Sequence, residues 1–153
     1  MPHYDPARMS SPASRFAPRW LRTLAWLGVF VWLGAICFSS SLPGSELQRL
    51  AHFMFWDKAQ HFLAFAIGSA NLALVLRWST PWPPARVALF TILAVATFGA
   101  VDEIHQLFTP GRSGGDAFDW LADAFGAAAG AGSTLFIHAR RRPSPHLLAP
   151  ARD

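Results

Sequence analysis

Residues 20–38 read WLRTLAWLGVFVWLGAICF, a segment that is apolar apart from Arg22 and Thr23 near its start. Its length falls within the roughly 17 to 25 residues that an α-helix needs to cross a bilayer. A cleaved signal peptide is the alternative, but its apolar core is typically about 7 to 15 residues long. The Ser-rich stretch after Phe38 also lacks a small-x-small cleavage pair. We therefore expect a transmembrane helix here.

Three further apolar segments follow, at residues 62–76, 87–101 and 117–137. The segment that begins at residue 87 is expected to continue as helix toward Phe108. Prolines and turn-forming pairs separate the segments, since the residue before a proline avoids helix. These breaks lie at Pro43-Gly44, at Pro81, Pro83 and Pro84, and at Pro110-Gly111. The sequence thus predicts an all-α fold, a bundle of four transmembrane helices.

The composition agrees with a small polytopic membrane protein. The chain has 153 residues, 52% hydrophobic and 14% charged, with seven Trp and thirteen Phe, and its mean hydropathy is +0.26. This is too apolar for an ordinary soluble domain and too short for two domains. The single cysteine, Cys37, excludes an intrachain disulfide and a thiolate metal cluster.

The chain divides into three predicted parts. Residues 1–18 are rich in Pro, Ser and Arg and lack periodicity, so we expect a disordered cytoplasmic segment. Residues 19–139 form the predicted four-helix transmembrane domain. Residues 140–153 form a basic tail, which we also expect to be disordered and cytoplasmic.

The basic residues predict the orientation of the bundle. Positions before the first segment, around the second break and after the last segment share one side: Arg8, Arg15, Arg19, Arg22, Arg77, Arg86, Arg140, Arg141, Arg142 and Arg152. Only Arg49, Lys58 and Arg112 fall on the other side. The positive-inside rule then places both termini in the cytoplasm. The net charge of +4 is explained by topology, so we expect no nucleic-acid partner.

Polar residues at the predicted outer ends recur at helical spacing, which places each set on one helix face. The sets are Lys58 with His61, Glu103 with Gln106, Asp102 with His105, and Asp116, Asp119 and Asp123. In the last segment the stripe continues through Gly126 and Gly130, a GxxxG match that lets a neighbouring helix approach closely. A homo-oligomer through these two glycines is one possibility.

Four motifs follow one another in order: Asp57-Lys58-x-x-His61-Phe62, Asp102-Glu103-x-x-Gln106-Leu107-Phe108, Pro110-Gly111-Arg112, and Asp116-x-x-Asp119-Trp120-Leu121 with Gly126. In this order and spacing the chain resembles the VanZ-like membrane proteins over roughly residues 20–137. The resemblance implies a multi-pass protein of the bacterial cytoplasmic (inner) membrane and a link to teicoplanin resistance. The distribution of Arg and Lys predicts that the polar site lies on the periplasmic or extracellular face. The resemblance implies no reaction. The signature residues carried over are Lys58, His61, Glu103, Gln106, Arg112 and Asp119, whereas many relatives have Asn at the position of Asp123.

Two functions are open for this outer-face site. The first is binding or shielding an anionic envelope component, such as a lipid-linked precursor, or a glycopeptide drug, in contact with membrane lipid. Arg112 could grip a phosphate or carboxylate bidentately. The candidate binding residues are Lys58, Gln106, Arg112, Asp116 and Asp123.

The second function is an outer-leaflet hydrolase or transferase acting on a lipid-linked precursor, with His61, Glu103 and Asp119 as candidate acid–base groups. The same three residues could hold a divalent ion, but nothing in their spacing demands it. We therefore expect neither a metal nor a cofactor. A purely structural role is also open, in which ion pairs such as Lys58 with Asp119, or Arg112 with Glu103, lock the helix ends together.

Overall fold

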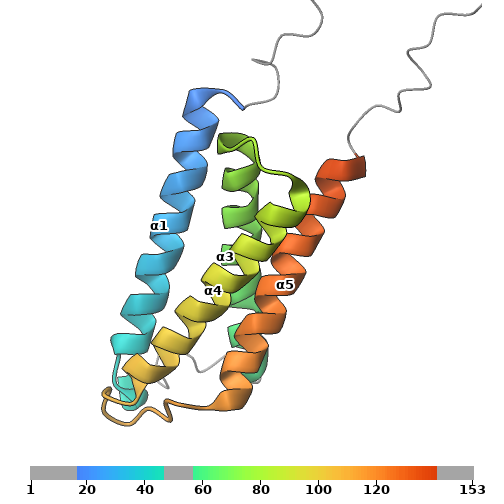
Figure 1. The fold of residues 1–153 in the computed structure, drawn as a ribbon. Coiled ribbons are helices and arrows are strands. Elements are labelled where there is room, and N and C mark those ends of the chain that lie inside the picture. The colour runs from blue at the N-terminus through green and yellow to red at the C-terminus, as the bar shows by residue number, and fades with distance from the viewer. Residues whose placement is uncertain (1–16, 47–56, 141–153) are drawn as a thin grey trace, which may run out of the picture.

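The computed structural model describes residues 17–46 and 57–140. Four long helices run side by side and alternate in direction: α1 (Arg19–Ser41), α3 (Asp57–Ser79), α4 (Pro84–Gln106) and α5 (Ala117–Arg140). Both ends of the described chain lie at the same end of the bundle (Figure 1). The described residues contain no strand, so the all-α prediction is confirmed. The predicted disordered segments fall almost entirely outside the described residues.

Among the described residues, three helices are long and apolar enough to cross a membrane, namely α1, α3 and α4. Each has 23 residues, which gives a helix about 35 Å long, against a hydrocarbon core of about 30 Å. The helix α5 has 24 residues but carries Asp119 and Asp123 in its first two turns. Three such helices fit a multi-pass membrane protein. The fourth span stays a prediction.

The outer surface of the bundle is apolar. Large side chains such as Val31, Ile67 and Phe125 are about two-thirds exposed, whereas the interior positions include many small residues, for example Gly68 and Ala131. In water this exposure would favour aggregation, but lipid tails are as apolar as these side chains. The surface therefore suits a lipid environment.

The predicted glycine contact joins α3 and α5 of the same chain. A Cβ atom at Gly126 would collide with the carbonyl oxygen of Phe62, and one at Gly130 with that of Ala66. Both glycines are buried. Ser69 strengthens the contact by donating a buried hydrogen bond of 2.6 Å to the carbonyl of a residue in α5. Both glycines are thus covered by α3 of the same chain, and a homo-oligomer through them stays a prediction.

Aromatic side chains fill the middle of the bundle beneath its polar end. Phe65 is buried in α3 and lies edge-on to Trp32 of α1. The Trp32 indole N–H donates to the carbonyl oxygen of Ala64, at 2.9 Å. Phe98 of α4 packs against both rings. These rings form an apolar layer next to the polar residues of α3 and α5, which lie one or two turns nearer the N-terminal ends of these helices.

Candidate functional site

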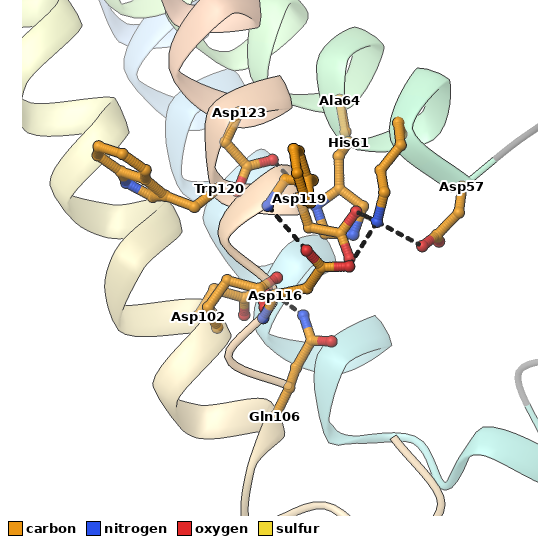
Figure 2. Close-up of polar contacts among 12 residues, drawn as sticks. Asp57, His61, Ala64, Asp102, Gln106, Asp116, Asp119, Trp120 and Asp123 are labelled. Carbon is orange, nitrogen blue, oxygen red and sulfur yellow. Dashed lines mark hydrogen bonds and ion pairs between the residues drawn. The ribbon is translucent and has the colours of Figure 1, made fainter. Parts of the chain in front are cut away.

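The polar ends of α3, α4 and α5 meet at the end of the bundle that holds the loop between α4 and α5 (Figures 1 and 2). All the residues that the sequence analysis singled out as candidate site residues lie in this region. They are Lys58 and His61 from α3, Glu103 and Gln106 from α4, Arg112 and Asp116 from the loop, and Asp119 and Asp123 from α5. We call these eight residues and Asp102 the polar cluster.

Lys58 is surrounded by carboxylates. Its Nζ donates to Oδ2 of Asp116 at 2.7 Å and to Oδ1 of Asp119, and Oδ2 of the exposed Asp57 lies 3.7 Å away. The predicted pair with Asp119 is therefore present (Figure 2). Through these contacts Lys58 ties the start of α3 to the loop and to the first turn of α5.

His61 is held by the most deeply buried acid of the cluster. Its Nδ1 lies 3.0 Å from Oδ1 of Asp123, whose side chain is 1% exposed. The imidazole stacks on the ring of Phe65, with an angle of 11° between the planes. The other oxygen of Asp123, Oδ2, has no hydrogen-bond partner and lies beside Gly99, where a Cβ would crowd it. Asp123 thus has a definite place in the site, facing His61.

Glu103 is buried, with 5% of the residue exposed. Its Oε2 accepts the backbone N–H of Asp116 at 3.0 Å, and its Oε1 has no hydrogen-bond partner. The sequence analysis paired Glu103 with Arg112, and that pair is wrong. The carboxylate receives a backbone donor from the loop instead, because the chain turns back over it.

Arg112 binds an amide rather than an acid. Its Nε and Nη2 both donate to Oε1 of Gln106, at 3.2 and 2.7 Å, and Nε2 of Gln106 donates to Oδ2 of Asp102 at 2.8 Å. No carboxylate in the described part of the chain lies within ion-pair distance of Arg112. The half-buried guanidinium therefore keeps an uncompensated positive charge.

Asp102 is the site residue that sequence reasoning missed. It is buried, with 6% exposed, and it orients the amide of Gln106. Its spacing of four residues from Gln106 was a usable signal, because i, i+4 side chains meet on a helix. The expected neighbour of Asp102 was His105, which is exposed.

The loop is held over the site by backbone geometry. Gly115 adopts a φ of 79°, a conformation that residues with a Cβ rarely take, and its N–H donates to the Glu103 carbonyl at 3.1 Å. Thr109 donates to the carbonyl of Ser40, at 3.1 Å, and so fastens the loop to the end of α1. These contacts fix the positions from which Arg112 and Asp116 reach the cluster.

The site is acidic as a whole. Six carboxylates, counting Asp57, surround two basic side chains. The hydrogen bond from Lys58 lowers the pKa of Asp116, with a further contribution from the N–H of Phe118. The described residues include two sets with the geometry to hold a metal ion, His61 with Glu103 and Asp123, and His61 with Asp57 and Asp119. The set suggested from sequence combined His61 and Glu103 with Asp119, whereas the structure brings Asp123 to them.

An apolar groove of about 460 Å³ runs beside Lys58 between α3 and α5. Two of its lining side chains, Leu63 and Phe125, are more than half exposed, so the groove opens to the outer surface of the bundle. Its lining residues are Lys58, Ala59, Phe62, Leu63, Ala122 and Phe125.

The chain was compared with protein families, curated proteins and solved structures. Neither a curated protein nor a solved structure gives a match to the chain. A family model described as VanZ/LLP1 matches residues 16–138. This range includes α1, α3 and α4, α5 up to residue 138, and every residue of the polar cluster. The chain belongs to the VanZ/LLP1 family.

Proposed function

We propose that all four helices cross the bacterial cytoplasmic membrane, with both termini cytoplasmic and the polar cluster at the periplasmic or extracellular face. The described basic residues away from the polar cluster support this orientation, because they lie at the opposite end of the bundle. They are Arg19, Arg22, Arg77, Arg86 and Arg140. The acids of α5 do not argue against a fourth span, since Asp119 and Asp123 are buried in the bundle and do not meet lipid.

The polar cluster serves, in this proposal, to bind the phosphate-bearing head group of a lipid-linked envelope component. The observation that carries it is Arg112, a half-buried guanidinium without a carboxylate partner among residues 17–46 and 57–140. Gln106 orients it through Nε and Nη2, and guanidinium recognises phosphate and carboxylate oxygens by charge-assisted, bidentate hydrogen bonds. A glycopeptide drug is the other ligand class that the family resemblance suggests, and the link to antibiotic tolerance rests on that resemblance.

The acidity of the site restricts how such a ligand binds. A free anion is repelled by the carboxylates around Lys58, so the contact has to be made at Arg112, at the rim of the cluster. A lipid has an advantage over a soluble anion, because its chain can lie along the bundle and hold the head group near the rim. The groove lined by Phe62 and Phe125 has a volume and an apolar surface that suit part of an acyl or prenyl chain.

A second function, an outer-leaflet hydrolase or transferase, is favoured by a different observation. His61 is oriented by Asp123 at 3.0 Å and shares a cluster with the buried Glu103. An oriented imidazole beside a carboxyl group is an arrangement that can move a proton during reaction of a phosphate or acyl bond. Such a reaction would use the same head group that Arg112 holds.

The test is lipid binding by the full-length chain in nanodiscs. A polyprenyl phosphate at increasing mole fraction serves as the probe, and phosphatidylcholine alone serves as the neutral reference. Replacement of Arg112 by Ala removes a charge-assisted contact worth about 1.5–3 kcal/mol, so affinity should fall roughly 10- to 100-fold. Arg86→Ala is the matched control, because Arg86 lies at the opposite end and stacks on Trp82. Equal affinity of the Arg112→Ala protein and wild type would refute the proposal, and conversion of the probe that His61→Ala abolishes would favour the enzyme.

A further inference from the structure

We infer that His61, Glu103 and Asp123 form a binding site for one divalent metal ion of the Zn²⁺ or Mn²⁺ type. This inference goes beyond anion binding and does not depend on it, because Arg112 takes no part in the metal site. Imidazole and carboxylate together are ligands that Zn²⁺ and Mn²⁺ both accept.

The three side chains already have the required separation. Each offers one nitrogen or oxygen atom, and these atoms all lie within 4.8 Å of one another. Metal–ligand bonds of about 2.0–2.2 Å place the ligand atoms of a tetrahedral site roughly 3.4 Å apart. The distance from Nδ1 of His61 to Oδ1 of Asp123 is 3.0 Å. Coordination of an ion would require His61 and Asp123 to separate slightly and any wider pair of the set to close.

A second observation points to a cation, independently of the clustering. Oε1 of Glu103 and Oδ2 of Asp123 are buried atoms without a hydrogen-bond partner in the described part of the chain, and their residues are 5% and 0% exposed. Leaving one buried acceptor unsatisfied costs about 1–3 kcal/mol, and more when the group is charged. A divalent ion between the two carboxylates would compensate both at once.

The basic side chains nearby are already engaged. Lys58 bonds to Asp116 and Asp119, and Arg112 bonds to Gln106. The same engagement explains why the second possible set is weaker. Its Asp119 is held by the ammonium group of Lys58, and its third member, Asp57, has a side chain that is 61% exposed.

The surroundings of the three residues support them as ligands. Oε2 of Glu103 is fixed by the N–H of Asp116 at 3.0 Å, and the stacking of His61 on Phe65 limits rotation of the imidazole. Contacts of this kind orient metal ligands and raise metal affinity. The His61 side chain is 14% exposed, so an ion can enter from the aqueous end. Three protein ligands leave a coordination position for water or for a head-group oxygen.

The experiment uses the full-length chain, purified in mild detergent without chelator. Metal content is measured by inductively coupled plasma mass spectrometry, followed by stripping and titration with Zn²⁺ and with Mn²⁺. We expect about one ion per chain for wild type and a shift of the unfolding midpoint to higher temperature with added metal. Glu103→Gln and His61→Ala should each weaken binding by more than about tenfold, as loss of a ligand requires. His105→Ala is the matched control, because His105 is an exposed histidine of the same region and should bind like wild type.

The outcomes separate the alternatives. Wild-type protein that shows no saturable binding of either ion overturns the inference. Binding that persists in Glu103→Gln and His61→Ala also overturns it. If a variant fails to fold, X-ray absorption of metal-loaded wild type decides, since the site requires nitrogen and oxygen ligands that include an imidazole. Arg112→Ala should keep the metal and lose anionic lipid, whereas Glu103→Gln should lose the metal, so this inference and the proposed function fail separately.

Discussion

Replacement of Lys58 by Met should destabilise the protein more than any other single change at the rim of the site. Met keeps most of the length and apolar volume of the side chain but removes the charge. Asp119, which is 4% exposed, then loses the ammonium group that compensates it. Removing one partner of a buried ion pair costs about 3–5 kcal/mol, because the remaining charge is left without compensation.

The size of the effect follows from the exposure of the two partners. The Lys58 side chain is 25% exposed and that of Asp119 is 5% exposed, so solvent screens the pair in part and the lower limit applies. We expect Lys58→Met to lower the free energy of unfolding by about 3 kcal/mol. The double variant Lys58→Met/Asp119→Asn should recover more than half of this loss, since it no longer contains the unpaired charge. The assay is reversible unfolding in mixed micelles with increasing SDS, followed by helix content.

A matched control acts on the same ammonium group. Asp57 lies 3.7 Å from Nζ of Lys58 but its side chain is 61% exposed, so Asp57→Asn should change stability by no more than about 0.5 kcal/mol. Two results would refute the reasoning: a loss below about 1 kcal/mol for Lys58→Met, or a double variant no more stable than Lys58→Met alone.

Two further predictions concern packing and pH. Gly130→Val should prevent the close approach of α5 to Ala66 of α3 and lower the unfolding midpoint markedly. Gly132→Val should be tolerated, because none of the other described helices comes within 4 Å of a Cβ at Gly132. Equal midpoints for the two variants would contradict the contact at Gly130. The pKa of Asp116 is below its ordinary value of 3.8 in the folded protein, mainly through the hydrogen bond from Lys58. Its stabilising contribution is therefore present above pH 3.8 and lost as the pH falls through the folded pKa. The stability difference between wild type and Asp116→Asn should accordingly shrink in acid, and a constant difference from pH 7 to pH 2.5 would show that Asp116 does not act through its charge.

The helices were predictable because their signals are local. Apolar runs bounded by Pro and Gly predicted all four. Pro84 is the first residue of α4, and Pro83 before it has an extended conformation. The sequence underestimated the lengths, since α3 begins at Asp57 and ends at Ser79 rather than covering only residues 62–76. The apolar run alone is shorter than the helix, whereas the spacing of Lys58 and His61 indicated helix before residue 62, and the structure has helix there.

It was predictable that these polar residues gather at one end of the bundle, whereas the partner of each side chain was not. Helical spacing indicated which residues share a face, and Lys58 does meet Asp119. Arg112 meets Gln106 instead of Glu103, because the loop folds back and offers the Asp116 N–H to the glutamate. That choice depends on the positive φ of Gly115, which fixes the path of the loop. Spacing along a helix carries no information about such a turn.

Hydropathy and packing lead to different conclusions about whether α5 suits a membrane, because of its two acids. Asp119 and Asp123 lower its apolar character, and α5 is absent from the helices that qualify as membrane spans by composition. Yet both residues are buried, and they face Lys58 and His61 of α3. On the same face, one turn after Asp123 and two turns after Asp119, Gly126 lets the two helices approach closely. Both acids of α5 thus face a side chain of α3 that the glycines bring near, which hydropathy along α5 alone does not reveal.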